Sequence, residues 1–205
     1  MSAARNPALQ ELLDAMIDGI AQHAAPDSDA GKALARVRAA AGTPGEQGVS
    51  EPTEPRPPGH ACLAEALTAA KSNGGYAARA AAALEKLEPQ ITWYRREGLT
   101  PEQAEFPDRH ALASLIGPAD RSGSLEVRGD LRVGVSLVAP GIMYPDHHHP
   151  PEELYLALTA GEWRQDRGPW FSPGPNGIVY NTPNILHGMR ATDEPQLAVW
   201  ALPVP

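Results

Sequence analysis

The residue pattern of the chain changes after Pro89, from one typical of helices to one typical of strands. Before this point alanine is abundant and apolar residues recur at spacings of three and four, as in amphipathic helices. After it, short strand-like runs alternate with turn residues, at 113–115, 125–128, 131–138, 153–158, 178–181 and 196–202, with 91–94 as a first strand or extended arm. Antiparallel strands at this spacing predict a sandwich or small barrel, preceded by a helical region.

The first half contains four predicted helices. The first follows Asn6, which is placed to cap it, with Pro7 in its first turn. The second runs from residues 28–29 to about 41 and ends at Gly42; its apolar stripe is weak, so we expect it to pack loosely. Two shorter helices are expected at 61–70 and 76–87. Segment 42–59, rich in Pro, Gly and Glu, is typical of a linker or mobile loop.

Composition excludes several classes of function. The formal net charge of −8 and scattered basic residues argue against a nucleic-acid partner. No run is apolar over the 18 to 20 or so residues that a membrane span needs, and the N-terminus does not resemble a signal peptide, so we expect a cytoplasmic protein. The single Cys62 excludes an internal disulfide and a cysteine-rich zinc site, which leaves His and carboxylate ligands for any metal.

Metal-ligand side chains concentrate in residues 146–155, Asp-His-His-His-Pro-Pro-Glu-Glu-Leu-Tyr. If this stretch is extended, His147 and His149 point to one side, because side chains alternate along a strand. By the same alternation Glu153 and Tyr155 share a face. A turn at the two prolines could therefore bring two imidazoles, a carboxylate and a phenol together.

A further histidine, His187, follows a later strand and a proline turn, and one sheet could return it to the same place. A set of His147, His149, Glu153 and His187 suits Zn(II), Fe(II), Mn(II), Co(II) or Ni(II) and can leave a position open for substrate. The ion itself is not fixed by these ligands. Only one of the adjacent carboxylates Glu152 and Glu153 can face the site, and the face shared with Tyr155 favours Glu153.

Other histidines have simpler interpretations. The side chain of His148 should point away from its neighbours, toward solvent or the outer edge of the site. His23, His60 and His110 lack partners at useful spacing, so we expect ordinary surface or core residues.

The spacing of these residues resembles the two motifs of the cupin superfamily. The first is Gly141-x5-His147-x-His149-x3-Glu153-x7-Gly161, and the second is Gly177-x5-Pro183-x3-His187. The chain departs from the general pattern by one extra residue before Gly161, one fewer after Pro183, and Ala191 where Asn is frequent. The resemblance implies a mainly β fold, a cupin β-barrel (small jelly-roll) at 91–205 that binds a metal, with an N-terminal α-helical region at 1–90.

Tyr144-x4-His149-x3-Glu153-x-Tyr155, together with the preceding helical region, resembles the bacterial dimethylsulfoniopropionate lyases of the cupin type, especially the DddQ group. In that family the positions matching His149, Glu153 and His187 bind the metal, and the position of His147 lies beside it and can also ligate. The tyrosine matching Tyr155 is the metal-adjacent catalytic group, and the one matching Tyr144 lines the substrate pocket.

The resemblance implies β-elimination from a small sulfonium carboxylate, giving dimethyl sulfide and acrylate. The metal would polarise the carboxylate, and Tyr155, made more acidic by the cation, would remove the α-proton. A sulfonium cation favours an aromatic wall; the candidates are Trp163, Trp170, Tyr180 and Trp200, with Trp163 preferred. Two alternatives stay open: another metal-dependent cupin enzyme, such as a dioxygenase or isomerase, or a non-catalytic ligand-binding cupin. A homodimer is possible.

Overall fold

The computed structural model describes residues 4–48, 52, 55–97, 103–119 and 123–204. The helices are α1 (Pro7–Ala21), α2 (Asp29–Ala41), α3 (Leu63–Ser72) and α4 (Gly75–Leu87), with short 3-10 helices η1 (Pro58–Cys62), η2 (Glu88–Gln90) and η4 (Phe106–Asp108). The strands are β1 (Glu46–Gln47), β2 (Trp93–Tyr94), β3 (His110–Gly117), β4 (Glu126–Val127), β5 (Leu131–Val138), β6 (Met143–His147), β7 (Glu153–Ala157), β8 (Glu162–Gln165), β9 (Ile178–Asn181), β10 (His187–Arg190) and β11 (Gln196–Pro203).

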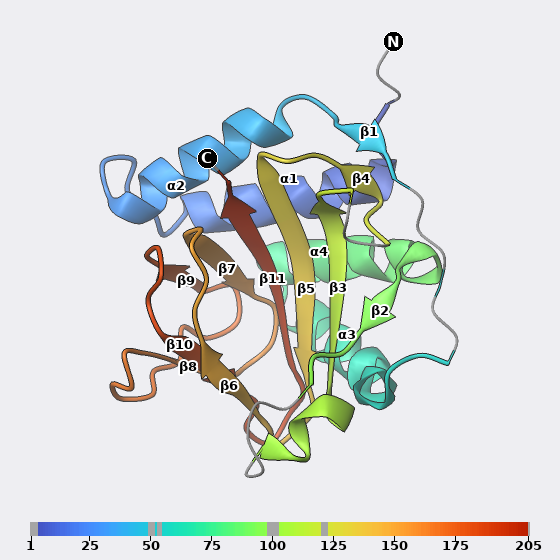
Figure 1. The fold of residues 1–205 in the computed structure, drawn as a ribbon, viewed down its shortest axis with the longest axis vertical. Coiled ribbons are helices and arrows are strands. Elements are labelled where there is room, and N and C mark those ends of the chain that lie inside the picture. The colour runs from blue at the N-terminus through green and yellow to red at the C-terminus, as the bar shows by residue number, and fades with distance from the viewer. Residues whose placement is uncertain (1–3, 49–51, 53–54, 98–102, 120–122, 205) are drawn as a thin grey trace.

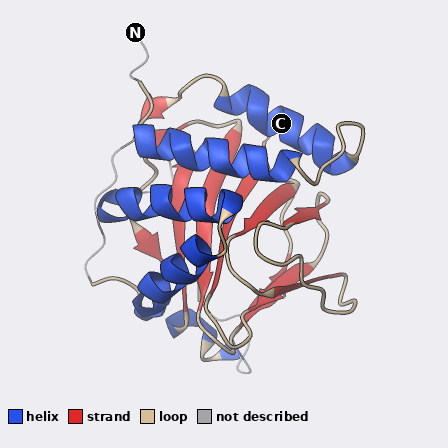
Figure 2. Ribbon diagram, turned by 180° about the vertical axis from the view of Figure 1, so that it is seen from behind, coloured by secondary structure: helices blue, strands red, loops and turns tan. Residues whose placement is uncertain are grey.

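The strands form two sheets (Figure 1). The larger has the order β1-β4-β3-β5-β11-β7-β9, with β2 paired to β3, and the smaller has the order β6-β10-β8. Seen from behind, the four α-helices cover one face of the larger sheet (Figure 2). The predicted class, mainly β with an N-terminal helical region, is confirmed, although the described strands form two sheets rather than one closed barrel.

The first two helices begin where their sequences predict. The Asn6 side chain accepts hydrogen bonds from the backbone N–H groups of Ala8 and Leu9 at 2.9 and 3.4 Å, and Ser28 caps α2 by accepting from Gly31 at 3.0 Å. These bonds satisfy N–H groups that a helix start leaves free. The loose packing expected for α2 is wrong, because Ala33 and Val37 are fully buried. Alanine needs little space, so a weak stripe still packs closely.

Side chains alternate along the central strands, so successive residues lie on opposite faces of the larger sheet. In β7, Leu154 and Leu156 belong to the apolar cluster that the sheet shares with the helices, while Tyr155 and Ala157 belong to a second cluster on the opposite face. The same alternation holds in β5 and β11. One face of the larger sheet is therefore a helix-covered core, and the other faces the smaller sheet.

The Pro- and Gly-rich segment is partly built into the sheet. Its β1 pairs antiparallel with β4, and the backbone N–H of Gly45 donates to Glu126 at 2.8 Å. Residues 49–51 and 53–54 of this predicted linker lie outside the described residues. The division of the chain at residue 90 stays a prediction, and one apolar cluster spans it.

The smaller sheet was not predicted, apart from the extended geometry expected around His147. Gly141 (φ 73°) occupies the left-handed region at the turn into β6, a conformation that suits glycine.

No helix among the described residues has the length and apolar character needed to span a membrane.

Candidate metal centre

Three histidines meet between the two sheets. His147 ends β6 and His187 begins β10, and the two are direct partners in the antiparallel pairing of these strands. His149 follows β6 by two residues. One ring nitrogen of each lies within 4.8 Å of the others, a separation that could hold a metal ion. The site thus combines a short loop with a strand from almost forty residues later in the chain.

The backbone orients all three imidazole rings in the same way. The Nδ1 atoms of His147, His149 and His187 lie 2.9, 2.8 and 2.9 Å from the carbonyl oxygens of Pro145, Pro151 and Ile185. A carbonyl only accepts, so each Nδ1 carries the proton and donates. In the neutral ring this leaves the Nε2 lone pair free to bind a metal.

Glu153 completes the cluster from β7. Its Oε2 atom lies 3.3 Å from Nε2 of His149 and 3.2 Å from Nε2 of His187, and Asn181 donates to the same oxygen at 3.2 Å. The neighbouring Glu152 faces away from the histidines. Its carboxylate pairs with Arg36 of α2 and accepts from the Tyr180 hydroxyl at 2.8 Å.

The surroundings of Glu153 and His147 keep these two side chains in the protonation states that can bind a metal. Burial alone would raise the pKa of Glu153, but the neighbouring imidazoles of His149 and His187 hold it at about 2. Burial lowers the pKa of His147 to about 4, with a further contribution from His187. The carboxyl is therefore ionised and His147 neutral at pH 7.

The donor set fits a divalent cation. Nε2 of His187 is buried without a hydrogen-bond partner among the described residues and faces the Glu153 carboxylate, so two lone pairs oppose each other at 3.2 Å. A cation between them removes this repulsion. Imidazole and carboxylate together suit several transition metals and do not single one out.

Two buried tyrosines lie beside the cluster. Tyr155 shares the cavity face of β7 with Glu153, and burial together with the charge of Glu153 raises its pKa well above 10. The Tyr144 hydroxyl accepts from Nη1 of Arg96 at 2.8 Å; burial raises its pKa to about 12, although Arg96 opposes the shift. Without a bound cation, both phenols therefore stay protonated at neutral pH.

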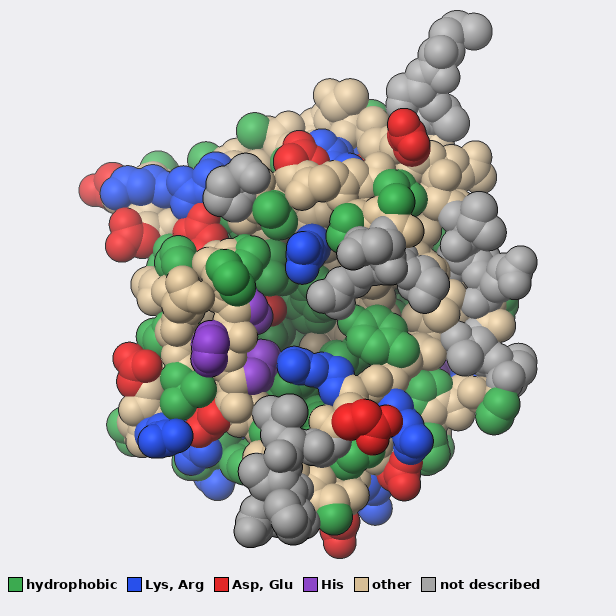
Figure 3. All heavy atoms as spheres, viewed as in Figure 1, with side chains coloured by type: hydrophobic (Ala, Val, Ile, Leu, Met, Phe, Trp, Pro, Cys, Tyr) green, Lys and Arg blue, Asp and Glu red, His purple; other side chains and the backbone are tan. Residues whose placement is uncertain are grey.

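A cavity of about 470 Å³ opens beside these groups. Figure 3 shows it as a hollow with histidines on one side, apolar side chains at its floor, and Lys or Arg side chains at its edge. Its lining comes from both sheets and includes Tyr94, Arg96, Leu112, Arg132, Ser136, Tyr144, His147, His149, Glu153, Tyr155, Trp200 and Leu202.

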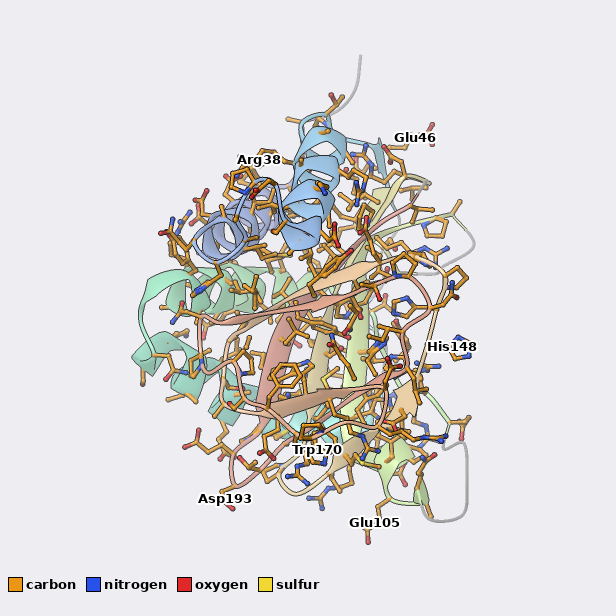
Figure 4. All side chains as sticks on the ribbon, turned by 90° about the vertical axis from the view of Figure 1, so that its left-hand side faces the viewer. Arg38, Glu46, Glu105, His148, Trp170 and Asp193 are labelled. Carbon is orange, nitrogen blue, oxygen red and sulfur yellow. The ribbon has the colours of Figure 1, made fainter. Side chains whose placement is uncertain are left out.

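Only one of the four predicted aromatic candidates lines this cavity. Trp200 does so, and it fits because Gly134 opposite has no side chain: a Cβ there would lie 2.1 Å from the indole. Trp163, the preferred candidate, is buried behind Tyr155 with ring centroids 6.3 Å apart. Trp170 stacks between Arg164 and Arg190, away from the cavity (Figure 4).

The remaining histidines lie where the sequence predicted. His148 is exposed and projects from the molecular surface (Figure 4). His23 is exposed, His60 lies 3.1 Å from Glu88, and His110 is fully buried in the core. None of these contributes a nitrogen to the three-histidine cluster.

Sequence reasoning missed several cavity residues, among them Tyr94, Arg96 and Arg132. Arg132 carried a detectable signal, since it is a polar residue at an alternate position within the apolar run 131–138. Tyr94 lies in a predicted strand whose inner face was not assigned. Arg96 follows that strand without a distinguishing pattern.

Comparison with known proteins identifies the family to which the chain belongs. The family model described as dimethylsulfoniopropionate lyase matches residues 29–198. Dimethylsulfoniopropionate lyase DddQ of Ruegeria pomeroyi is 32% identical over 97 residues, so the match covers 47% of this chain and about half, 46%, of that relative.

Two solved structures share the fold over nearly the whole chain. One belongs to a study of the lyases RdDddP and RnDddQII, with a TM-score of 0.66, 23% identity, and coverage of 96% of this chain and 92% of that one. DddQ from Ruegeria pomeroyi gives a TM-score of 0.63 at 24% identity, covering 97% and 92%. On the family match over 170 residues, 29 to 198, this chain belongs to the dimethylsulfoniopropionate lyase family.

Proposed function

We propose that this protein is a metal-dependent carbon–sulfur lyase that cleaves dimethylsulfoniopropionate to dimethyl sulfide and acrylate. The family supports the reaction. The observation that carries the proposal is the arrangement on the cavity wall: three imidazole Nε2 atoms and the Glu153 carboxylate converge, and Tyr155 lies on the same strand face two residues from Glu153.

The metal ligands we propose are His147, His149, Glu153 and His187. The ion is Zn, Fe, Mn, Co or Ni, since nitrogen and oxygen donors accept each of these. When bound, it supplies Lewis acidity that polarises the substrate carboxylate and favours the ionised form of a nearby phenol.

Tyr155 is the proposed base. Its oxygen takes the proton from the carbon α to the carboxylate, the C–H electron pair forms the new double bond, and the pair of the breaking C–S bond leaves with sulfur. The leaving group is neutral dimethyl sulfide, so it needs no protonation. Tyr155 is 2% exposed, and this exclusion of water protects the phenolate from solvent.

The other aromatic residues of the cavity recognise the substrate. Trp200 and Tyr94 line the cavity, and aromatic rings attract a sulfonium cation, which has no hydrogen-bond donor of its own. Tyr144 contacts the substrate or serves as a second acid or base. Because its oxygen already accepts from Arg96, its own O–H remains available to donate into the cavity.

The proposal is tested by incubating metal-loaded protein with dimethylsulfoniopropionate and measuring dimethyl sulfide in the headspace. Tyr155→Phe should lower the rate by about 10²- to 10⁴-fold, the usual contribution of a positioned base, with unchanged metal content. Tyr76→Phe, which removes a phenol from α4 far from the cavity, is the matched control. Wild-type release no greater than that of heat-killed protein would reject the lyase, and full activity in Tyr155→Phe would reject only the base.

Two broader assignments rest on the sequence alone. We propose a cytoplasmic location and assembly as a homodimer, with a small sulfonium carboxylate as the binding partner rather than a nucleic acid or a membrane. Sizing of the purified protein by light scattering tests the dimer, because two chains would give twice the mass of 21.8 kDa.

A further inference from the structure

Arg132 lies on the cavity face of the larger sheet, across from the metal centre. In the pairing of β7, β11 and β5, Tyr155 is opposite Trp200, and Trp200 is opposite Gly134. Two residues further along, Arg132 is opposite Leu202, and continuing the register places Glu153 on the other side of Leu202. Directly opposed residues lie about 5 Å apart, so the Cα atoms of Arg132 and Glu153 are about 10 Å apart. An extended arginine side chain covers much of that distance.

The guanidinium of Arg132 has no partner among the residues that the structure describes. Its Nε atom is buried and makes no hydrogen bond, and no ion pair involves the side chain. Most other arginines pair with carboxylates: Arg5, Arg36, Arg56, Arg79, Arg95, Arg128, Arg164 and Arg190. Arg38 also has no ion pair with any residue that the structure describes, but it is exposed to water. A half-buried, unpaired cation in a cavity is costly, and an anionic ligand would remove that cost.

The charge of the cavity favours anions. Its lining contains two arginines, Arg96 and Arg132, against one carboxylate, Glu153, which faces the histidines. The protein as a whole has a formal charge of −8, so the cavity is a local reversal of sign. Low-dielectric walls concentrate such a field and attract ligands of the opposite charge. Arg96 already donates one of its N–H groups to Tyr144, whereas Arg132 donates to none of the described residues.

We propose that Arg132 binds the carboxylate of the substrate and so sets its orientation in the cavity. This rests on the proposed lyase function and deepens it by assigning a substrate-binding residue. The planar fork of an arginine matches a carboxylate, with two parallel N–H donors. Successive cavity-facing residues on a strand are about 7 Å apart. A carboxylate at Arg132 therefore directs the sulfonium end toward Trp200 and leaves the α-carbon near Tyr155.

Binding of acrylate tests this assignment without turnover. Acrylate carries the carboxylate and lacks the sulfonium, and acrylamide is a neutral molecule of nearly the same shape. Calorimetric titration of the metal-loaded protein should show acrylate binding that weakens at least about tenfold in Arg132→Gln, the loss expected for a charged hydrogen bond. Arg132→Lys, which keeps the charge without the fork, should lie between the two. Arg38→Gln removes an exposed charge and should bind as wild type does.

Kinetics give a second readout. Loss of an anchor that acts in both the ground state and the transition state raises KM about tenfold or more and changes kcat little. Metal content and melting temperature should match wild type in every variant. Equal acrylate affinity in wild type and Arg132→Gln, or equal affinity of wild type for acrylate and acrylamide, would overturn the anchor.

The two proposals fail separately. If Arg132→Gln loses acrylate binding but wild type releases no dimethyl sulfide, the carboxylate anchor stands and the lyase reaction is wrong. If wild type is an active lyase and Arg132→Gln keeps both its acrylate affinity and its KM, the reaction stands and the anchor is wrong.

Discussion

The two faces of the larger sheet are both buried, yet they differ in chemistry. On β7, Leu154 and Leu156 pack against the helices, while Glu153 and Tyr155, one residue away in each case, face the cavity. Burying a carboxylate and a phenol costs free energy unless each finds a partner. The helix-covered face stabilises the fold, and the cavity face retains polar groups at positions where packing alone would favour apolar ones. The comparison predicts that substitutions on the two faces affect different properties.

The largest effect is expected from removing a ligand on the cavity side. His187→Ala should weaken metal binding by more than about 100-fold, because even outer partners of metal ligands are worth 10- to 100-fold. Dimethyl sulfide release should fall to background while circular dichroism stays unchanged. Elemental analysis of the purified variant measures the loss. His23→Ala, which removes an exposed histidine outside the cavity lining, serves as control. Retention of a full complement of metal by His187→Ala would contradict the proposed difference between the two faces.

A cavity in the helix-covered face should instead lower stability. Leu156 is fully buried against α1, where a Cβ added at Gly19 would lie 3.0 Å from its Cδ1 atom. Leu156→Ala should reduce the free energy of unfolding by about 2 to 5 kcal/mol. Denaturant titration measures this, and Leu156→Met should cost less than about 1.5 kcal/mol. We expect metal content per folded chain to be unchanged, and its loss would show that the two faces are coupled.

Acidification should lower the stability of the folded protein, because the buried ring of His110, at one end of the cavity face, resists protonation. The ring donates from Nδ1 to the carbonyl of Phe106 at 2.6 Å and accepts at Nε2 from the Arg96 backbone N–H at 2.8 Å. Burial lowers its pKa to about 4. The unfolded chain, with a pKa near 6.5, binds more protons between these values, so stability is lost as pH falls from about 6.5 to about 4.

The expected loss is up to about 2 kcal/mol between pH 7 and pH 5, from 1.4 kcal/mol per pKa unit. Denaturation of wild type and His110→Gln at both pH values measures it. The variant should show the smaller dependence on pH, and His23→Gln, which changes an exposed histidine, should follow wild type. Identical dependence in His110→Gln and wild type would contradict the account.

The smallest effect concerns polar residues at the edge of the helix-covered face. Tyr180 is opposite Leu154, on the side of the helices, and its hydroxyl donates to the buried Glu152, which also pairs with Arg36 of α2. Tyr180→Phe should cost about 1 kcal/mol, since one partner of Glu152 remains. Thermal unfolding measures this loss, and lyase activity should change less than about twofold. A large loss of metal would mean that Glu152 also positions His149.

Much of this arrangement could be predicted from the sequence. Caps at Asn6 and Ser28 mark two helix starts, and the alternation of Glu153, Leu154, Tyr155 and Leu156 describes a strand with two different faces. The spacing of the histidines predicted a cluster, because each ring is fixed locally by a carbonyl two residues away.

The smaller sheet could not be predicted in the same way. Its strands are four or five residues long, and β6 contains Pro145 beside polar residues, so no apolar run marks them. Which face of such a short strand is covered depends on packing between distant segments. For this reason Trp163 was expected in the cavity but lies behind it, while Arg132, in a long alternating strand, could have been identified.

The central claim is that the cavity face supplies a metal centre on which turnover depends. We would strip the protein with a chelator, restore one divalent metal in steps, and measure bound metal and dimethyl sulfide release on the same samples. The rate should rise in proportion to occupancy and level off at about one ion per chain, the capacity of a single cluster of four ligands. A metal-free protein that releases dimethyl sulfide at the full rate would contradict the claim.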